Sequence, residues 1–355
     1  MADSQPRVLL TGGSGFIASH ILDQLLEEGF SVTFTVRSDH KGRAVRDSLP
    51  ETQKPRVNYV IVPDIVADAA FDDACSYLPP AVIGTNRSQA VKSAPFTYVI
   101  HTAMPCHSNC TDPIKDFVDP AVKGTTGILK SIHAYAPTVK RVVLTSSATT
   151  LLNLKEHAKL YNEDSYSPLT LEDAYASPHY AYSTSKVYAE RAAWSFVATT
   201  SPSFTLSTIN NTYTFGPIQR FITTPSAVNL TNERIMHMIR GDYAHNLPPN
   251  ERIYTFVDVR DVANAHVRAM LSSKAAGKRF YVVAGYFTNR DVVEGIRARF
   301  PQLERVLPAR GVGEPLAEDV YQFDNTRSRE ILGLEYKSLG ESVGDAAASM
   351  MRLLD

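Results

Sequence analysis

Apolar and polar positions alternate between two patterns along the first two thirds of the chain. Six short runs are almost continuously apolar, which is typical of parallel strands covered by helices on both faces. These predicted strands are residues 7–11, 31–37, 57–62, 97–102, 141–146 and 205–210. The stretches between them have helical periodicity, most clearly residues 16–28, 114–135 and 181–199. This order predicts an α/β fold with a doubly wound parallel (Rossmann) sheet, which binds ligands at the carboxyl ends of its strands.

The pattern changes near Phe215, where prolines and glycines become more frequent and the helices become shorter. A further strand is predicted at 254–259, followed by a helix at 261–271. We expect this strand to return to the main sheet. The prediction is a dinucleotide-binding domain of residues 1–215 and 251–284, with a smaller substrate-binding lobe of residues 216–250 and 285–355.

A glycine-rich turn follows the first predicted strand. Gly12 permits a tight turn, and Gly15 lets backbone N–H groups approach a pyrophosphate at the start of the next helix. The small Ala18 lets that helix pack on the strand, and Phe16 and Ile17 open it. A glycine turn without a ligand is the alternative, but the strand before it and the helix after it favour a dinucleotide site.

The end of the second predicted strand indicates which dinucleotide binds. A site for NAD has a carboxylate there, whereas this strand ends at Arg37, with Lys41 and Arg43 close behind. A guanidinium binds a 2′-phosphate through charge-assisted hydrogen bonds, so NADPH is the predicted cofactor. Asp39 is the counter-evidence. Asp64 and Ile65, after the third strand, are expected to contact adenine, although Asp64 could instead cap the next helix.

Composition limits the partners and the compartment. The chain has 355 residues, a net charge of -1, and 44% hydrophobic residues, so we expect neither a nucleic-acid nor a membrane partner. Three cysteines are too few for a disulfide framework, which favours the reducing cytoplasm. Cys106 and Cys110 lack a second pair of ligands at zinc spacing, so no metal site is predicted.

A second motif supplies the groups that reduction of a carbonyl requires. Tyr182 and Lys186 are four residues apart and therefore share one face of a helix. A free tyrosine has a pKa of about 10, and a neighbouring ammonium lowers it, so that the phenol becomes a usable proton donor. Ser147 ends the fifth strand, where its hydroxyl can orient a carbonyl; Ser146 is its rival for that role. The alternative is a solvated amphipathic helix that carries a Tyr and a Lys by chance.

Together these motifs resemble the extended short-chain dehydrogenase/reductase family over nearly the whole chain. The chain is most similar to the branch with dihydroflavonol and cinnamoyl-CoA reductases and fungal NADPH-dependent aldehyde and ketone (methylglyoxal-type) reductases. The segments that carry the resemblance are 99–105, 119–125, 141–147 and 256–263. It implies an NADPH-dependent carbonyl reductase with Ser147, Tyr182 and Lys186 as the catalytic trio. It also suggests that Ala103 borders the cofactor. Further cofactor contacts are expected at Thr102, Tyr182, Lys186 and Asn210, with Lys186 on the nicotinamide ribose hydroxyls.

The sequence departs from the family pattern in several places. Asn211 stands where the family usually has proline, beside the expected nicotinamide site. Ala121 occupies the helix position where many short-chain enzymes have a catalytic asparagine. Residues 75–90 look like an insertion, which we interpret as a surface loop dispensable for catalysis; a family-specific loop near the active site is the alternative.

The substrate is predicted to be an aldehyde or ketone, such as an apolar or aryl ketone, a keto ester or a dicarbonyl, rather than a charged metabolite, because the residues expected around the nicotinamide are mostly apolar or aromatic. They are Met104, Cys106, Leu151, Tyr213 and Phe215. Core packing is the alternative for each of them, and Arg220 is the one candidate for binding an anion.

The sequence leaves other functions open: a nucleotide-sugar epimerase or dehydratase, a hydroxysteroid dehydrogenase, and a non-catalytic NADP-binding redox sensor. The chain is expected to be a monomer or a homodimer.

Overall fold

A computed structural model describes residues 6–76, 95–104 and 111–354. Its centre is a seven-stranded sheet in which all neighbouring strands are parallel. In spatial order the strands are β10 (Lys278–Val282), β7 (Thr205–Asn211), β5 (Arg141–Thr145), β4 (Phe96–His101), β1 (Arg7–Thr11), β2 (Ser31–Val36) and β3 (Val57–Ile61). The doubly wound Rossmann fold is therefore confirmed, and the six predicted strands agree with the observed ones to within one residue at each end.

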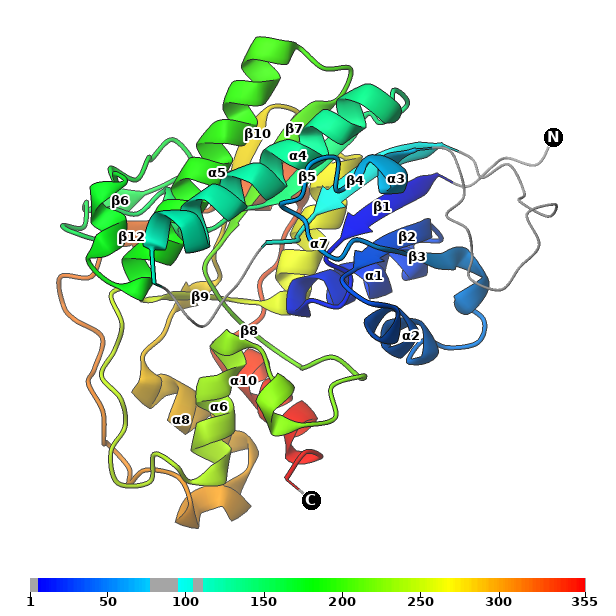
Figure 1. Cartoon of the computed structure of the whole chain (residues 1–355). Coiled ribbons are helices and arrows are strands. Elements are labelled where there is room, and N and C mark those ends of the chain that lie inside the picture. The colour runs from blue at the N-terminus through cyan, green and yellow to red at the C-terminus, as the bar shows by residue number, and fades with distance from the viewer. Residues whose placement is uncertain (1–5, 77–94, 105–110, 355) are drawn as a thin grey trace.

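Helices cover both faces of this sheet (Figure 1). On one face α1 (Phe16–Glu27) packs against α7 (Val259–Leu271), and on the other α4 (Asp119–Tyr135) packs against α5 (Pro178–Thr200). Alternate residues of β1 point to the two faces, so Val8 and Leu10 join the cluster of α1 whereas Leu9 joins that of α4. Shorter helices complete the layers: α2 (Asp39–Asp47), α3 (Asp72–Cys75) and α9 (Thr326–Leu332).

A smaller sheet lies beside the main one and carries a helical lobe. Its strands are β11 (Gly285–Tyr286), β9 (Thr255–Asp258) and β8 (Tyr213–Phe215). The helices α6 (Leu230–Arg240), α8 (Asn289–Arg299) and α10 (Leu339–Met351) pack around one apolar cluster next to it (Figure 1). A further short pair, β6 (Leu160–Tyr161) with β12 (Gln322–Phe323), is parallel. The division into two domains stays a prediction.

The expectation that the strand near 254–259 returns to the main sheet is wrong. This strand is β9, and it pairs with β8 and β11 in the smaller sheet. The seventh strand of the main sheet is β10, whose sequence begins with Lys278 and Arg279. The sequence did not predict β10 as a buried strand, because such strands are recognised as apolar runs and this one begins with two cations. Arg279 is nevertheless buried, since its guanidinium is paired inside the protein with Glu190.

Within the described part of the chain, no helix is long and apolar enough to cross a membrane. The suspected insertion lies outside the described residues from position 77 onward, and its role stays a prediction.

Candidate active site

The glycine turn between β1 and α1 brings backbone close to backbone. Gly12 has a φ of 72°, which favours glycine, and a Cβ there would lie 3.0 Å from the Ala103 Cα atom. A side chain at Gly13 would overlap the Phe34 ring, at 2.4 Å from its Cδ2 atom. The N–H of Gly15 donates to the Gly12 carbonyl oxygen at 2.8 Å, and α1 begins at the next residue. The first N–H groups of α1 therefore face the space beyond β1, as a pyrophosphate site requires.

The Thr11 hydroxyl fixes the end of β4 beside this turn. It accepts the N–H groups of Thr102 and Ala103, each at 3.2 Å, and lies 2.7 Å from His101 Nδ1. Because its lone pairs receive these two donors, its own proton goes to Nδ1, and the imidazole carries its proton on Nε2. Burial, together with the positive charge of Lys186, lowers the pKa of His101 to about 3, so the ring is neutral. Thr102 and Ala103 are thus held against Gly12, where the sequence placed the cofactor.

Replacing Thr11 with valine should lower the free energy of unfolding by about 2–3 kcal/mol, because the partly buried N–H groups of Thr102 and Ala103, just after β4, lose their acceptor. Urea denaturation measures this loss. Thr126→Val is the matched control: Thr126 donates only along its own helix, to the Val122 carbonyl oxygen, and its change should stay within about 0.5 kcal/mol. A T11V midpoint equal to that of the wild type would contradict the role given to this hydroxyl.

Two exposed cations follow β2, next to the glycine turn. Arg37 comes directly after the strand and Lys41 lies in the first turns of α2. The nearby carboxylate of Asp39 is engaged: it accepts from Tyr59 Oη at 2.7 Å and pairs with Arg43. The Tyr59 hydrogen bond is the main cause that lowers the pKa of Asp39. Since Gly13 N–H donates to Thr35 at 2.9 Å, the end of β2 lies beside the pyrophosphate turn.

The two residues expected to meet adenine follow β3. Asp64 accepts the N–H of Val66 at 3.0 Å and thereby closes a local turn, which is close to the capping role that the sequence left open. Ile65 faces Gly124 of α4, where a Cβ would lie 3.4 Å from the Ile65 Cδ1 atom. Both residues lie at the carboxyl edge of the sheet.

Helix α5 carries the predicted phenol and ammonium on one face. It begins at Pro178, where Ser177 caps it by accepting the N–H of Tyr180 at 3.3 Å. Lys186 Nζ lies 5.9 Å from the centroid of the Tyr182 ring. The Tyr182 side chain is 37% exposed, so it is open to a ligand.

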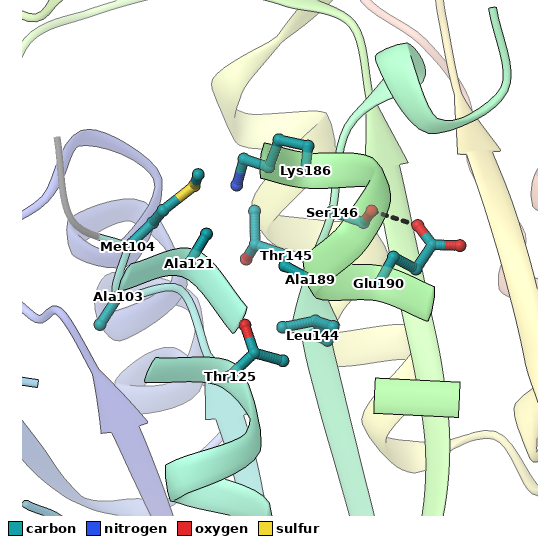
Figure 2. A pocket seen from close by; sticks show the side chains of 10 residues that line it. All are labelled: Ala103, Met104, Ala121, Thr125, Leu144, Thr145, Ser146, Lys186, Ala189 and Glu190. Carbon is teal, nitrogen blue, oxygen red and sulfur yellow. Dashed lines mark hydrogen bonds between the residues drawn. The ribbon is translucent and has the colours of Figure 1, made fainter. Parts of the chain in front are cut away.

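The hydroxyl of Ser147 lies where β5 ends. It is 8% exposed and accepts both the N–H and the hydroxyl of Thr149, at 3.2 and 3.0 Å. These two bonds use its lone pairs and leave its proton for another acceptor. The proton of Ser146, in contrast, is donated to Glu190 (Figure 2). The short turn of Ala148–Thr150 after Ser147 packs against α5.

A cavity of about 20 Å³ lies beside Lys186 between α4 and α5 (Figure 2). Met104, Ala121, Ser146 and Glu190 are among the residues that line it. This volume is enough for about one water molecule. Ala121, at the position where many related enzymes have asparagine, leaves part of this space open.

The remaining predicted residues fall into three groups. Tyr213 is partly buried; its hydroxyl donates to Glu251, and Arg234 lies 4.8 Å from its ring. Burial and Glu251 raise the pKa of Tyr213. Leu151 and Phe215 are 1% and 0% exposed within apolar clusters, which fits the packing alternative. Cys106, like Cys110, lies outside the described residues.

The side chain of Asn210, a predicted cofactor contact, is held by other groups of the protein. It is fully buried, and its amide donates to Thr150 and to Glu190 at 2.8 and 2.6 Å while its oxygen accepts from Thr208. Because protein groups occupy this amide, a cofactor contact at Asn210 has to come from the backbone. The neighbouring Asn211 donates to Thr214 Oγ1 at 3.0 Å and supports the local turn.

Sequence reasoning missed two features of the site. It gave no role to Gly13, although the contact with Phe34 requires a glycine there. It also gave none to Glu190 and Arg279, which meet at 2.7 Å behind Ser146. The spacing of Glu190 four residues after Lys186 was the one available signal, because it places both side chains on one helix face.

The fold and these groups define a dinucleotide-binding oxidoreductase architecture. The chain belongs to the NAD dependent epimerase/dehydratase family, whose sequence model matches residues 8–284. The resemblance to the extended short-chain dehydrogenase/reductase family is thereby confirmed.

Fungal reductases are among the most similar relatives. The chain is 44% identical to the ketoreductase azaE of Aspergillus niger, over 99% of both sequences. It is 33% identical to the NADPH-dependent methylglyoxal reductase GRE2 of Saccharomyces cerevisiae, over 97% of this chain and 98% of that one. The crystal structure of the yeast methylglyoxal/isovaleraldehyde reductase Gre2 complexed with NADPH superposes with a TM-score of 0.82, at 31% identity and 98% coverage of both chains.

Proposed function

We propose that this protein is an NADPH-dependent carbonyl reductase that transfers hydride to an aldehyde or ketone and protonates the oxygen from Tyr182. The observation that carries the proposal is the juxtaposition of α5, with its phenol and ammonium on one face, and the Ser147 turn packed against it. The relatives named as ketoreductase and as NADPH-dependent methylglyoxal reductase support it.

The three side chains divide the chemistry between them. The Ser147 proton, which its bonds to Thr149 leave available, is donated to the carbonyl oxygen and orients the substrate. Tyr182 then gives its proton to that oxygen, and the Lys186 ammonium stabilises the phenolate that remains. NADPH, when bound, supplies the hydride that reaches the carbonyl carbon. The products are an alcohol and NADP⁺. Because the proton of Ser146 goes to Glu190, Ser147 is the better assignment of the two serines.

The cofactor is assigned to the carboxyl edge of the sheet. Its pyrophosphate is expected at the first turn of α1, and its 2′-phosphate at Arg37 and Lys41. Lys186 is also the expected partner of the nicotinamide ribose hydroxyls. The full set of assigned contacts is Gly12, Gly15, Phe16, Ile17, Arg37, Lys41, Asp64, Ile65, Thr102, Ala103, Tyr182, Lys186 and the backbone of Asn210.

The substrate is assigned to uncharged carbonyl compounds, such as apolar or aryl ketones, keto esters and dicarbonyls. Met104 and Tyr213 are the described residues expected to contact it. Arg220, the arginine proposed from the sequence to bind an anion, pairs with Asp23 at 2.9 Å, and Arg234, beside Tyr213, pairs with Glu251 at 2.7 Å. A carboxylate or phosphate on the substrate would therefore have to break an existing ion pair to bind either of these two arginines.

A panel of small aldehydes, diketones, aryl ketones and keto esters, assayed with NADPH and with NADH, tests the proposal. We expect loss of reduced-nicotinamide absorbance with NADPH in preference to NADH. Absence of turnover with either cofactor across the panel would contradict it, and would favour an epimerase-like enzyme or a non-catalytic sensor. A cytoplasmic location and a monomeric or homodimeric state stay predictions from the sequence.

A further inference from the structure

A buried carboxylate lies directly behind the proposed catalytic groups. Glu190 is only 4% exposed, and it lies one helical turn after Lys186 on α5. Its Oε1 atom accepts from Arg279 Nε at 2.7 Å and from Trp194 Nε1 at 3.4 Å. Its Oε2 atom accepts from the hydroxyl of Ser146, from Asn210 Nδ2 at 2.6 Å and from Thr150 Oγ1 at 3.0 Å. A buried charge is costly unless it is paired and hydrogen-bonded, and five donors meet that demand here.

These donors flank the serine that is proposed to bind the carbonyl. Ser146 immediately precedes Ser147, and Thr150 follows it by three residues. The Thr150 hydroxyl also lies 2.8 Å from the Ser147 carbonyl oxygen. The carboxylate on α5 therefore binds both ends of the turn that carries Ser147.

The Arg279 guanidinium connects Glu190 and the Ser147 turn to a second loop. Its Nη1 atom donates to the carbonyl oxygens of Glu163 and Ser165, at 2.9 and 2.6 Å. Its Nη2 atom lies 3.1 Å from Thr150 Oγ1. Arg279 thus fixes the direction of the Glu190 carboxylate as well as neutralising it.

Glu190 and Lys186 also line the same cavity of about 20 Å³ (Figure 2). Such a space holds about one water molecule, and the five hydrogen bonds to Glu190 hold its carboxylate beside it. Glu190 thus contacts the Ser147 turn through Ser146 and Thr150, while its own backbone belongs to the helix that carries Lys186 and Tyr182.

We propose that Glu190, with Arg279 as its counter-ion, is a positioning residue for the reduction. It holds the Ser147 hydroxyl in register with Tyr182 and Lys186 by joining the Ser146–Thr150 turn to α5. This inference rests on the proposed assignment of Ser147, Tyr182 and Lys186 as the catalytic trio.

A second buried carboxylate provides a matched comparison. Asp258 is fully buried, bonds the guanidinium of Arg260 at 2.8 Å, and accepts from the Ser342 hydroxyl at 2.8 Å. It resembles Glu190 in burial, charge and the kinds of partner, but it ties the smaller sheet to α10. Substituting Asp258 therefore measures how the loss of a buried ion pair that does not contact the trio affects stability and kcat.

The test compares Glu190→Gln with Asp258→Asn in the full chain, at a temperature well below the unfolding midpoint of both. We expect each to lower the midpoint. Only E190Q should lower kcat, by roughly 10- to 100-fold, because misplaced catalytic groups lose rate steeply. The Kd for NADPH, from nicotinamide fluorescence, should stay within about twofold for both variants. Equal kcat for E190Q and D258N would overturn the proposal.

A milder variant covers the case in which E190Q does not fold. Thr150→Val keeps the shape of the side chain and the Glu190–Arg279 pair. It removes the contacts of the Thr150 hydroxyl with Glu190 and with the Ser147 carbonyl oxygen, and it removes the acceptor of Asn210 Nδ2 and Arg279 Nη2. It should lower kcat by roughly tenfold with NADPH affinity retained; wild-type kcat would overturn the proposal.

Tyr182→Phe distinguishes a failure of the proposed catalytic trio from a failure of the role given to Glu190. If Y182F retains activity, the proposed trio fails. If Y182F is inactive while E190Q or T150V matches the wild type, only the role of Glu190 fails.

Discussion

Tyr182→Phe is expected to abolish nearly all turnover while the protein stays folded and binds NADPH. The phenol is the proposed proton donor to the carbonyl oxygen, and a positioned general acid contributes about 10²- to 10⁴-fold to a rate. We therefore expect kcat to fall by about 10³-fold, with the Kd for NADPH changed by less than about threefold. The substitution removes one oxygen atom and keeps the ring whose centroid lies 5.9 Å from Lys186 Nζ.

Tyr188→Phe is the control on the same helix. Its ring packs near the apolar cluster of Leu151 and Tyr161 and lies 5.5 Å from the Arg191 guanidinium. Loss of its hydroxyl should leave kcat within about twofold, because surface and peripheral changes of this kind are small. If Y182F kept more than a tenth of the wild-type kcat, the assignment of Tyr182 as the proton donor would be wrong.

Reversing the charge at Arg37 is expected to destroy the preference for NADPH. A hydrogen bond to a charged group contributes about 1.5–3 kcal/mol, and a carboxylate at the same place repels the 2′-phosphate. Arg37→Glu should thus raise the KM for NADPH by about 100-fold, and that for NADH by no more than about threefold. Steady-state kinetics with both cofactors measures the two changes.

Arg46→Glu is the matched control for this charge reversal. Arg46 is exposed and lies in the last turn of α2, at the far end of the helix from Lys41. It changes the net charge of the protein by the same amount, so a general electrostatic effect would appear in both variants. Equal effects of R37E on NADPH and NADH, or an R46E variant that behaves like R37E, would defeat the assignment of the 2′-phosphate site.

Much of the fold was predictable because most strands of the main sheet are buried on both faces. Burial on both faces requires continuous apolar runs such as Val142, Val143 and Leu144, and such runs are easily recognised in a sequence. The exception, β10, contains Arg279, and a cation looks solvent-exposed when its partner is far away in sequence. Its partner Glu190 lies 89 residues earlier. The strand β9 was assigned to the wrong sheet because an apolar run does not reveal its neighbours.

The site shows the same division between local and long-range information. The glycine turn and the pair of Tyr182 and Lys186 depend on short spacings, so they could be predicted from the sequence. The His101 imidazole and the Glu190 carboxylate depend on partners from other strands and helices, and neither could be read from local sequence. A glutamate in the middle of a helix is ordinarily solvated, whereas this one is enclosed by five donors.

Transfer of a deuterium label tests the central claim most directly. NADPH carrying deuterium at the transferable C4 position would be incubated with a carbonyl substrate found in the panel, and the products analysed by mass spectrometry. Our account predicts that the alcohol carries the label on its carbinol carbon and that NADP⁺ accumulates in equal amount. Substrate conversion without net consumption of NADPH, as in an enzyme that returns the hydride to its product, would contradict it.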